Sequence, residues 1–188
     1  LYKNIAITRG REKVEDLGSI TGAINIRALD ARRKDARWSI NMRYPKSNVI
    51  VITGTTNKSF EILPGAYDIE VATAPRQWNR NVKVSAGKET VIDLGCTTGV
   101  LIVKTADAEK KDTRYNVRIM KSENNEQAAF TVSNKPIEIV QGTYNVEVPS
   151  APVQVRKDIK VVAGEETVTE FLTDAQKTVE APPAKTKR

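Results

Sequence analysis

The stretch that decides the fold is Pro64-Gly65-Ala66-Tyr67-Asp68-Ile69-Glu70-Val71, which recurs as Gln141-Gly142-Thr143-Tyr144-Asn145-Val146-Glu147-Val148. In both copies, apolar residues alternate with polar ones, and successive side chains of a β-strand point to opposite faces. The copies stand 77 residues apart, and the same offset aligns residues 22–98 with residues 99–175 without a gap. In that alignment 25 of the 77 positions are identical. The chain therefore contains a duplicated unit whose strands have one buried and one wet face.

Short β-rich runs separated by turn residues fill the rest of each unit. In the first unit, strands are expected near residues 24–28, 37–44, 48–53, 58–63, 67–71, 82–84 and 89–94. Gly65 and Gly142 precede strands, where a tight turn with positive φ is expected, and Gly87 and Gly164 are expected in hairpins. About seven short strands per unit, without helical periodicity, predict an all-β fold. We expect two tandem antiparallel seven-stranded β-sandwiches, Ig-like or prealbumin-like.

The 77-residue offset also defines the domain organisation. Ile5–Val14 aligns with Val82–Val91, so the chain begins with the closing strands of an earlier unit, and the parent protein is expected to extend further in that direction. The Ala-, Pro- and Lys-rich end predicts a disordered tail. The predicted parts are a hairpin of a preceding repeat (1–21), repeat 1 (22–95), repeat 2 (99–173) and the tail (174–188). Because only a few residues join the repeats, they are expected to sit end to end with limited freedom.

Composition restricts the possible chemistry. The 188 residues hold 30 Lys and Arg against 23 Asp and Glu, a net charge of +7, and no histidine. The commonest general base and the commonest metal ligand are therefore absent from the sequence. The single cysteine, Cys96, excludes an internal disulfide and a cysteine-cluster zinc site. No apolar run is long enough to span a membrane. We expect a protein that is not an enzyme, with no cofactor.

A pair of aspartates in the polar connection 30–36 suggests a calcium loop at first sight. Asp30 and Asp35 recur as Asp107 and Asp112, and calcium is bound by clustered oxygen ligands. In the first copy, however, the run Arg32–Lys34 separates the two carboxylates and would repel a divalent cation. The expectation is a polar connection without a metal.

The positive charge is concentrated in the first unit. Residues 22–98 carry a net charge of +5, whereas residues 99–175 carry −2. We expect a solvent-facing sheet surface that attracts polyanions, formed by Arg27, Arg37, Arg43 and Lys83. Trp38 and Tyr44 are expected to point inward, which leaves few aromatic rings for stacking on nucleic-acid bases. Specific nucleic-acid recognition is therefore not expected.

Trp78 is a separate candidate. It follows Pro75-Arg76-Gln77 in what is expected to be a loop between strands. An indole in that place can stack on a sugar ring, or it can cap the end of the sandwich core. Both interpretations stay open at the level of sequence.

Two segments of the first unit resemble a known class of module. Leu63–Val71, with its Leu-Pro-Gly-x-Tyr pattern, and Val82–Thr90, with its Val-x-Val and Ala-Gly-x-Glu-Thr pattern, resemble tandem bacterial Ig-like and carboxypeptidase-regulatory-like modules. Such modules are transthyretin-type sandwiches. The run Gln77–Val82, followed by Thr98–Leu101, also resembles tandem modules appended to bacterial von Willebrand factor type A proteins. The second unit departs from the pattern, with Gln141 in place of the proline and Val155 in place of Trp78.

The resemblance implies a non-catalytic structural or interaction module, a spacer or protein-binding platform, of a bacterial envelope or extracytoplasmic protein. That implies a periplasmic, extracellular or cell-envelope location. The partner expected is a protein, including a second copy of the chain paired through the N-terminal hairpin. Two alternatives stay open, a carbohydrate or envelope polymer and a weakly bound polyanion. The candidate surface consists of Trp78, Arg76, Arg27, Arg37 and Arg43.

Overall fold

The computed structural model describes residues 9–10, 20–47 and 49–173. Within these ranges the regular structure is β-strand, and no helix is present. The first half contains β1 (Gly22–Leu29), β2 (Ser39–Arg43), β3 (Ile50–Thr55), β4 (Ser59–Ile62), β5 (Gly65–Val71), β6 (Gln77–Val84) and β7 (Glu89–Cys96). The second half contains β8 (Thr98–Ala106), β9 (Asn116–Lys121), β10 (Gln127–Val132), β11 (Pro136–Val140), β12 (Gly142–Val148), β13 (Gln154–Val161) and β14 (Glu166–Leu172).

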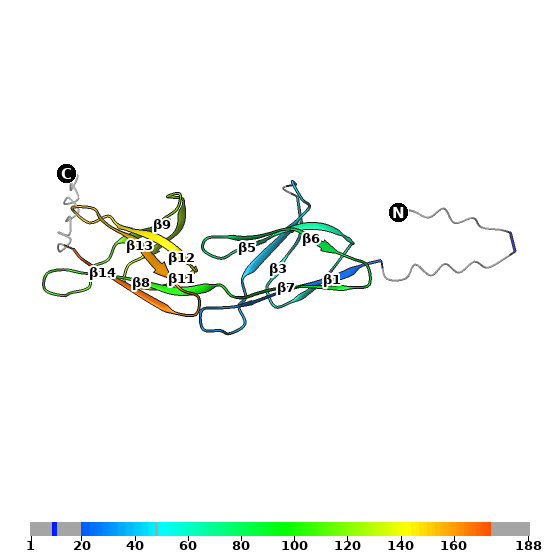
Figure 1. Ribbon diagram of the computed structural model, residues 1–188, viewed down its shortest axis with the longest axis horizontal. Coiled ribbons are helices and arrows are strands. Elements are labelled where there is room, and N and C mark those ends of the chain that lie inside the picture. The colour runs from blue at the N-terminus through cyan, green and yellow to red at the C-terminus, as the bar shows by residue number, and fades with distance from the viewer. Residues whose placement is uncertain (1–8, 11–19, 48, 174–188) are drawn as a thin grey trace, which may run out of the picture.

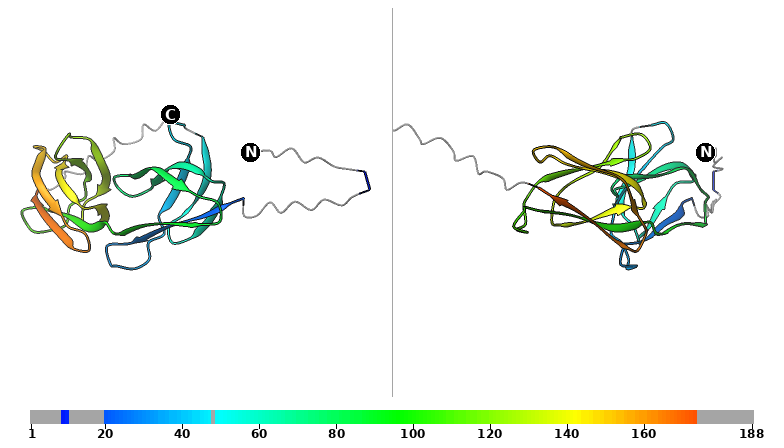
Figure 2. Two further views of the ribbon diagram at one scale, coloured as in Figure 1. Left: turned by 45° about the vertical axis from the view of Figure 1, so that its right-hand side comes forward. Right: turned by 60° about the vertical axis from the view of Figure 1, so that its left-hand side comes forward.

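The fourteen strands of the described residues form four sheets, two in each half of the chain. A sheet in the order β4-β1-β7 faces one in the order β3-β2-β5-β6, and we call this pair the first sandwich. The second sandwich pairs β11-β8-β14 with β10-β9-β12-β13. Figure 1 shows the two sandwiches one after the other along the long axis, and the left view of Figure 2 shows the green run from β7 into β8 that joins them. The predicted tandem all-β sandwich is confirmed.

The strands within the sheets are not all antiparallel. β1 pairs with β7 in parallel, and β8 pairs with β14 in parallel, while the other pairs are antiparallel. The fold is an Ig-like sandwich in architecture. In an immunoglobulin constant domain, however, the first, second, fifth and fourth strands share one sheet, whereas here β1 and β2 lie in opposite sheets.

The turn between β6 and β7 corrects one expectation. Gly87 and Gly164 do adopt positive φ, at 68° and 76°, but β6 and β7 belong to different sheets. The turn therefore carries the chain from one layer to the other and does not close a hairpin. Gly10, the equivalent glycine of the partial repeat, has a φ of 77°. The remainder of that repeat, including the predicted N-terminal hairpin, and the tail 174–188 lie outside the described residues.

The core of each sandwich consists of the inward-facing residues of its central strands. The first core contains Ile24, Ile26, Ile40, Met42, Tyr67, Ile69 and Val71, and the second contains Leu101, Val103, Val117, Ile119, Tyr144, Val146 and Val148. These sets match position by position at the 77-residue offset. The alternation that defined the repeat therefore also defines the buried faces.

A buried tyrosine closes the same corner of each sandwich. The Tyr67 hydroxyl donates to the backbone oxygen of Leu63 over 2.7 Å, and the Tyr144 hydroxyl donates to that of Val140 over 2.6 Å. Burial raises the pKa of both hydroxyls, that of Tyr144 to about 12. Gly65, which was expected to have positive φ, is absent from the left-handed region. An added Cβ there would meet the Tyr67 hydroxyl and ring at 3.4–3.5 Å, an ordinary contact distance, so neither backbone conformation nor space requires a glycine at this position.

The two aromatic residues that were expected inside the first sandwich differ in burial. Trp38 is half-buried and packs against the core. Tyr44 lies just beyond the end of β2, is 47% exposed and stacks on Tyr67 with ring centroids 5.6 Å apart. The Tyr44 ring therefore contacts the core residue Tyr67 but is not buried, because β2 ends at Arg43.

Candidate functional site

Two acidic residues lie on the outer face of the four-stranded sheet of the first sandwich. Asp68 and Glu70 alternate along β5 with core residues, so they point away from the core, yet they are only 7% and 2% exposed. Carboxylates are seldom buried unless they are paired. The residues that cover them come from the flanking strands β2 and β6, which pair with β5 on either side, and from the connection just before β6.

Glu70 binds two arginines, one through each carboxylate oxygen. Oε2 accepts from Nη2 of Arg43 over 2.7 Å, and Oε1 accepts from Nη1 of Arg76 over 2.5 Å. The Arg43 side chain is mostly covered, whereas that of Arg76 is largely in solvent. The partly buried Glu70–Arg43 pair is therefore the structural contact, and Arg76 closes it from outside.

Asp68 is held by the neighbouring strand. Its carboxylate accepts from the backbone N–H of Asn81 over 2.8 Å and from Nη1 of Arg80 over 2.9 Å. These contacts, the Asn81 backbone first, lower the pKa of Asp68 below its ordinary value. Asn81 has a φ of 55°, and the β5–β6 register shifts here. The resulting bulge places Arg80 over Asp68.

Trp78 lies in β6 between these cations. The guanidinium carbon of Arg80 is 4.1 Å from the indole centroid, and that of Arg43 is 5.5 Å away. Both distances are typical of cation–π contacts. The ring is 38% exposed and does not belong to the core. The expectations that Trp78 sits in a loop and caps the core were therefore wrong.

A shallow pocket opens at this cluster. It has a volume of about 330 Å³ and is lined by Arg43, Lys46, Ser47, Asp68, Trp78 and Arg80. Among the described residues, Nε of Arg43 is buried and has no hydrogen-bond partner. We call Arg43, Arg76, Trp78 and Arg80, with Asp68 and Glu70 beneath them, the Trp78 cluster. The three arginines of this cluster and the neighbouring Lys46 of the pocket outnumber the two carboxylates.

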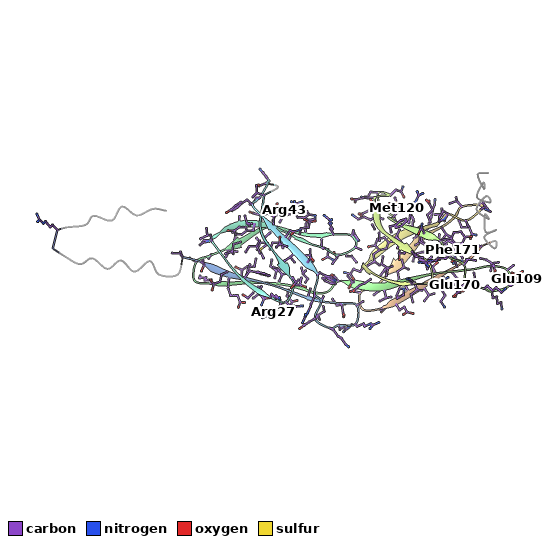
Figure 3. All side chains as sticks on the ribbon, turned by 180° about the vertical axis from the view of Figure 1, so that it is seen from behind. Arg27, Arg43, Glu109, Met120, Glu170 and Phe171 are labelled. Carbon is purple, nitrogen blue, oxygen red and sulfur yellow. The ribbon has the colours of Figure 1, made fainter. Side chains whose placement is uncertain are left out.

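Three of the five residues predicted for the candidate surface meet in this cluster: Arg43, Arg76 and Trp78. Arg27 lies on β1 in the opposite sheet, and Arg37 lies in the connection before β2. Figure 3 shows Arg27 and Arg43 on opposite sides of the first sandwich. The expected single basic face of Arg27, Arg37, Arg43 and Lys83 is therefore wrong. Arg43 on β2 and Lys83 on β6 share one sheet, whereas Arg27 on β1 lies in the opposite sheet.

The second sandwich has the same framework without the cluster. At the 77-residue offset, Met120 replaces Arg43, Val155 replaces Trp78 and Val153 replaces Arg76. Figure 3 labels Met120 at the place that corresponds to Arg43. Glu147, the counterpart of Glu70, keeps one pairing, with Arg118 at 3.4 Å. The Trp78 cluster is therefore an addition to one copy of the repeat.

In the polar connection after β1, backbone N–H groups of the same connection bind the Asp30 carboxylate. The Asp30 carboxylate accepts the backbone N–H groups of Arg32 and Lys34 at 2.8 and 2.9 Å. Cys96, at the end of β7, lies with Sγ 3.2 Å from the backbone oxygen of Asp30. Within the described ranges, no group of three potential ligands is placed to hold a metal ion. The residues of this connection thus build a turn at the end of the first sandwich.

No protein-family model and no curated protein matches the chain. Similar solved structures include the Bacillus anthracis TIE protein, at 14% identity and a TM-score of 0.35, covering 83% of this chain and 35% of that one. A streptococcal ancillary pilin matches at 14% identity and a TM-score of 0.32, and the match covers 84% of this chain and 63% of the pilin. GBS52, the minor pilin of Streptococcus agalactiae, matches at 12% identity and a TM-score of 0.33, and the match covers 86% of this chain and 99% of GBS52.

The chain spans about a third of the TIE protein's length. At these identities and TM-scores, the similarities indicate neither partners nor activity. The predicted association with carboxypeptidase-regulatory-like and von Willebrand type A proteins stays a prediction. Among the residues that the structure describes, no helix is long and apolar enough to cross a membrane.

Proposed function

We propose that this chain is a non-catalytic spacer and interaction segment of a bacterial envelope or extracytoplasmic protein. The observation that carries the proposal is the joint between the sandwiches. Oε1 of Glu138, on β11, accepts the backbone N–H of Ala31 from the first sandwich over 2.9 Å and the hydroxyl of Thr98 over 2.5 Å. One carboxylate thus ties the first sandwich to the second.

Further hydrogen bonds support a stiff joint. The N–H of Val140 donates to the backbone oxygen of Ala74 over 2.7 Å. Gln77 donates through Nε2 to the Thr97 hydroxyl over 3.0 Å, and the Gln141 N–H donates to the Thr97 oxygen over 2.8 Å. Contacts therefore come from the sandwich loops as well as from the short connection. A hydrogen-bonded joint of this kind favours holding attached domains at a fixed separation.

Three carboxylates of the first sandwich are already engaged in structural contacts, which supports a non-catalytic role. Asp68 and Glu70 are engaged by arginines and a backbone N–H, and Asp30 by turn N–H groups. General acid–base catalysis needs a group within reach of a substrate proton. These carboxylates instead hold the fold together.

Removal of the Glu138 carboxylate is expected to uncouple the sandwiches. In the wild-type chain, ¹⁵N relaxation should give one common rotational correlation time, and Glu138→Ala should give shorter and unequal times, because two donors lose their acceptor. Glu147→Ala removes an equal charge from the outer face of the second sandwich, away from the joint, and as the control it should keep the common value. Independent tumbling in the wild-type chain would refute the spacer function.

The Trp78 cluster favours a second function, the binding of a carboxylate-rich partner segment. Its pocket is cationic, and Arg43 keeps one buried N–H group without a partner among the described residues. Guanidinium groups bind carboxylates through charge-assisted hydrogen bonds. The indole already carries Arg80 at 4.1 Å, which favours an anionic ligand over a sugar stacked on Trp78.

Binding of poly-L-glutamate at low salt is expected to weaken about tenfold in Arg43→Met, because one charge-assisted contact is lost. Methionine is the residue of the second sandwich at this position. Because Arg43→Met leaves the buried Glu70 with Arg76 as its ion-pair partner, circular dichroism first verifies that the variant is folded. Arg27→Met removes an equal charge from the opposite sheet and should change the affinity less than about twofold. Isothermal titration measures both. Equal losses would indicate a nonspecific polyanion effect, and cellohexaose binding that is lost in Trp78→Val would instead support the carbohydrate alternative.

A further inference from the structure

The joint is built from two loops at one end of the first sandwich. The β1–β2 connection supplies Ala31, and the β5–β6 connection supplies Ala74. The first of these connections is the blue loop that lies between the two sandwiches in Figure 1. We call this end of a sandwich the loop end. Asp30, Ala31, Ala74, Pro75 and Gln77 are all identical in the second copy.

The second sandwich builds the same loop end with the same contacts. Asn57 donates through Nδ2 to the backbone oxygens of Ala28 and Ala36, each over 2.8 Å. Its counterpart Asn134 donates to those of Thr105 and Thr113, over 3.1 and 2.8 Å. Both asparagines have a φ of 61°. The β8–β9 connection is therefore held in the same shape as the loop that docks at the joint.

The acceptor at the joint also exists in two copies. Glu138 and Val140 receive the first sandwich, and at the 77-residue offset the first sandwich has Glu61 and Leu63. We call this opposite end of a sandwich the glutamate end. The glutamate is identical in the two copies, in a strand that otherwise differs at several positions.

The residues at the occupied joint are more buried than their counterparts at the 77-residue offset. Ala31 is 8% exposed at the joint, whereas its counterpart Ala108 is exposed. On the acceptor side, Val140 is half-buried, whereas Leu63 is 56% exposed. Figure 3 labels Glu109, the neighbour of Ala108, at the end of the second sandwich that is remote from the first. Among residues 20–47 and 49–173, the structure thus has one occupied joint and both halves of a second one without a partner.

We infer that the loop end of the second sandwich binds the glutamate end of a second copy of this chain. The Ala108 N–H then donates to Glu61, and the Leu63 N–H donates to the oxygen of Ala151. The net charges of −2 for residues 99–175 and +5 for residues 22–98 favour this head-to-tail contact over contacts between like ends. A heterologous contact of this kind does not close, so it extends into a filament of sandwiches. The inference rests on the spacer function proposed above.

Sedimentation velocity of the full chain tests this inference. Loading concentrations from about 10 µM to about 1 mM cover the range in which a weak contact becomes populated. The weight-average sedimentation coefficient should rise with concentration. Glu61→Ala and Ala108→Pro should each lower the association constant at least about tenfold, since each removes one half of the joint. Asp93→Asn, which removes the same charge further along β7 and away from the glutamate end, should associate as the wild-type chain does.

Mixing the two variants provides the sharper measurement. Glu61→Ala keeps the loop end and Ala108→Pro keeps the glutamate end, so their mixture should form a dimer that does not grow further. A wild-type chain that stays monomeric up to 1 mM, or a mixture that behaves as its separate components, would overturn the inference. A monomer whose sandwiches tumble together would leave the spacer function intact, so the two failures are distinguishable.

Discussion

Glu70→Ala is expected to lower the free energy of unfolding of the first sandwich by about 2–3 kcal/mol. Removal of one partner from a buried ion pair leaves the other charge without compensation. Here the Glu70 side chain is 3% exposed and serves Arg43 and Arg76 together, while Arg43 can still reach some solvent. That access to water places the expected loss below the largest values known for buried pairs.

Denaturant unfolding followed by tryptophan fluorescence measures this loss selectively. Both tryptophans of the chain, Trp38 and Trp78, lie in the first sandwich, so the signal reports that sandwich alone. Glu70→Gln keeps the shape and one hydrogen-bond acceptor and should lose about half as much.

Glu147→Ala is the matched comparison, because Glu147 occupies the same register position in the second sandwich. Its single pairing with Arg118 is 3.4 Å long and largely exposed. Exposed pairs of this kind contribute about 0–1 kcal/mol, so the expected loss is below that limit. Backbone NMR signals of the second sandwich during denaturant titration measure it. Equal losses in the two sandwiches would show that the arginine cover adds nothing to the stability of the first.

The sequence predicted which face of each strand is buried better than it predicted which strands pair with one another. Alternation at Tyr67, Ile69 and Val71 identified the core positions, and the 77-residue offset carried them into the second copy. The same alternation cannot tell a hairpin from a crossing between layers, because a glycine turn such as that at Gly87 serves both. The parallel pairing of β1 with β7 follows from that crossing and has no local signal.

The candidate site was predicted in part for the same reason. Arg43 and Trp78 were singled out by charge and ring chemistry, but their meeting depends on the pairing of β2 and β6 with β5. Asp68, Glu70 and Arg80 were missed as site residues because alternation describes outward residues as solvated. Their outward position was a usable signal, since two acids on a central strand need basic neighbours on the strands beside it.

The joint was anticipated only as a short connection. Its decisive residue, Glu138, follows the strand alternation of Pro136–Val140, and nothing in that strand distinguishes it from a solvated glutamate. The identity of Glu61 and Glu138 across the repeat was the available signal. In that strand the only other identical residue is the core isoleucine, Ile62 and Ile139, so an outward-facing glutamate retained in both copies points to a contact outside the sandwich.

Gly22→Ala and Gly99→Ala are each expected to destabilise their own sandwich by about 2 kcal/mol, because a methyl group forced into a packed backbone displaces its neighbours. Both glycines belong to the recurring Thr-Gly pair. A Cβ at Gly22 would overlap the backbone oxygen of Ser85, and one at Gly99 would overlap that of Val162. Neither glycine has positive φ, so the cost comes from space and not from backbone conformation.

The close approach has a structural origin in the turn between the layers. The Ala23 N–H donates to the oxygen of Lys88 over 2.9 Å, and the Gly87 N–H donates to that of Thr21 over 2.9 Å. The second sandwich repeats both bonds, from Val100 to Glu165 and from Gly164 to Thr98, over 2.9 and 2.8 Å. The turn is thus bound directly against the start of the first strand, which leaves no room for a side chain.

Gly65→Ala is the control for this prediction, because its added Cβ would meet the Tyr67 hydroxyl at 3.4 Å, an ordinary contact distance. Its effect should stay within about 0.5 kcal/mol, since a strand alanine also restricts the unfolded chain. Tryptophan fluorescence follows Gly22→Ala and Gly65→Ala, and backbone NMR during denaturant titration follows Gly99→Ala. Similar small losses at all three positions would mean that the layer-crossing turn can move away from the strand, and the recurrence of Thr-Gly would then need another cause.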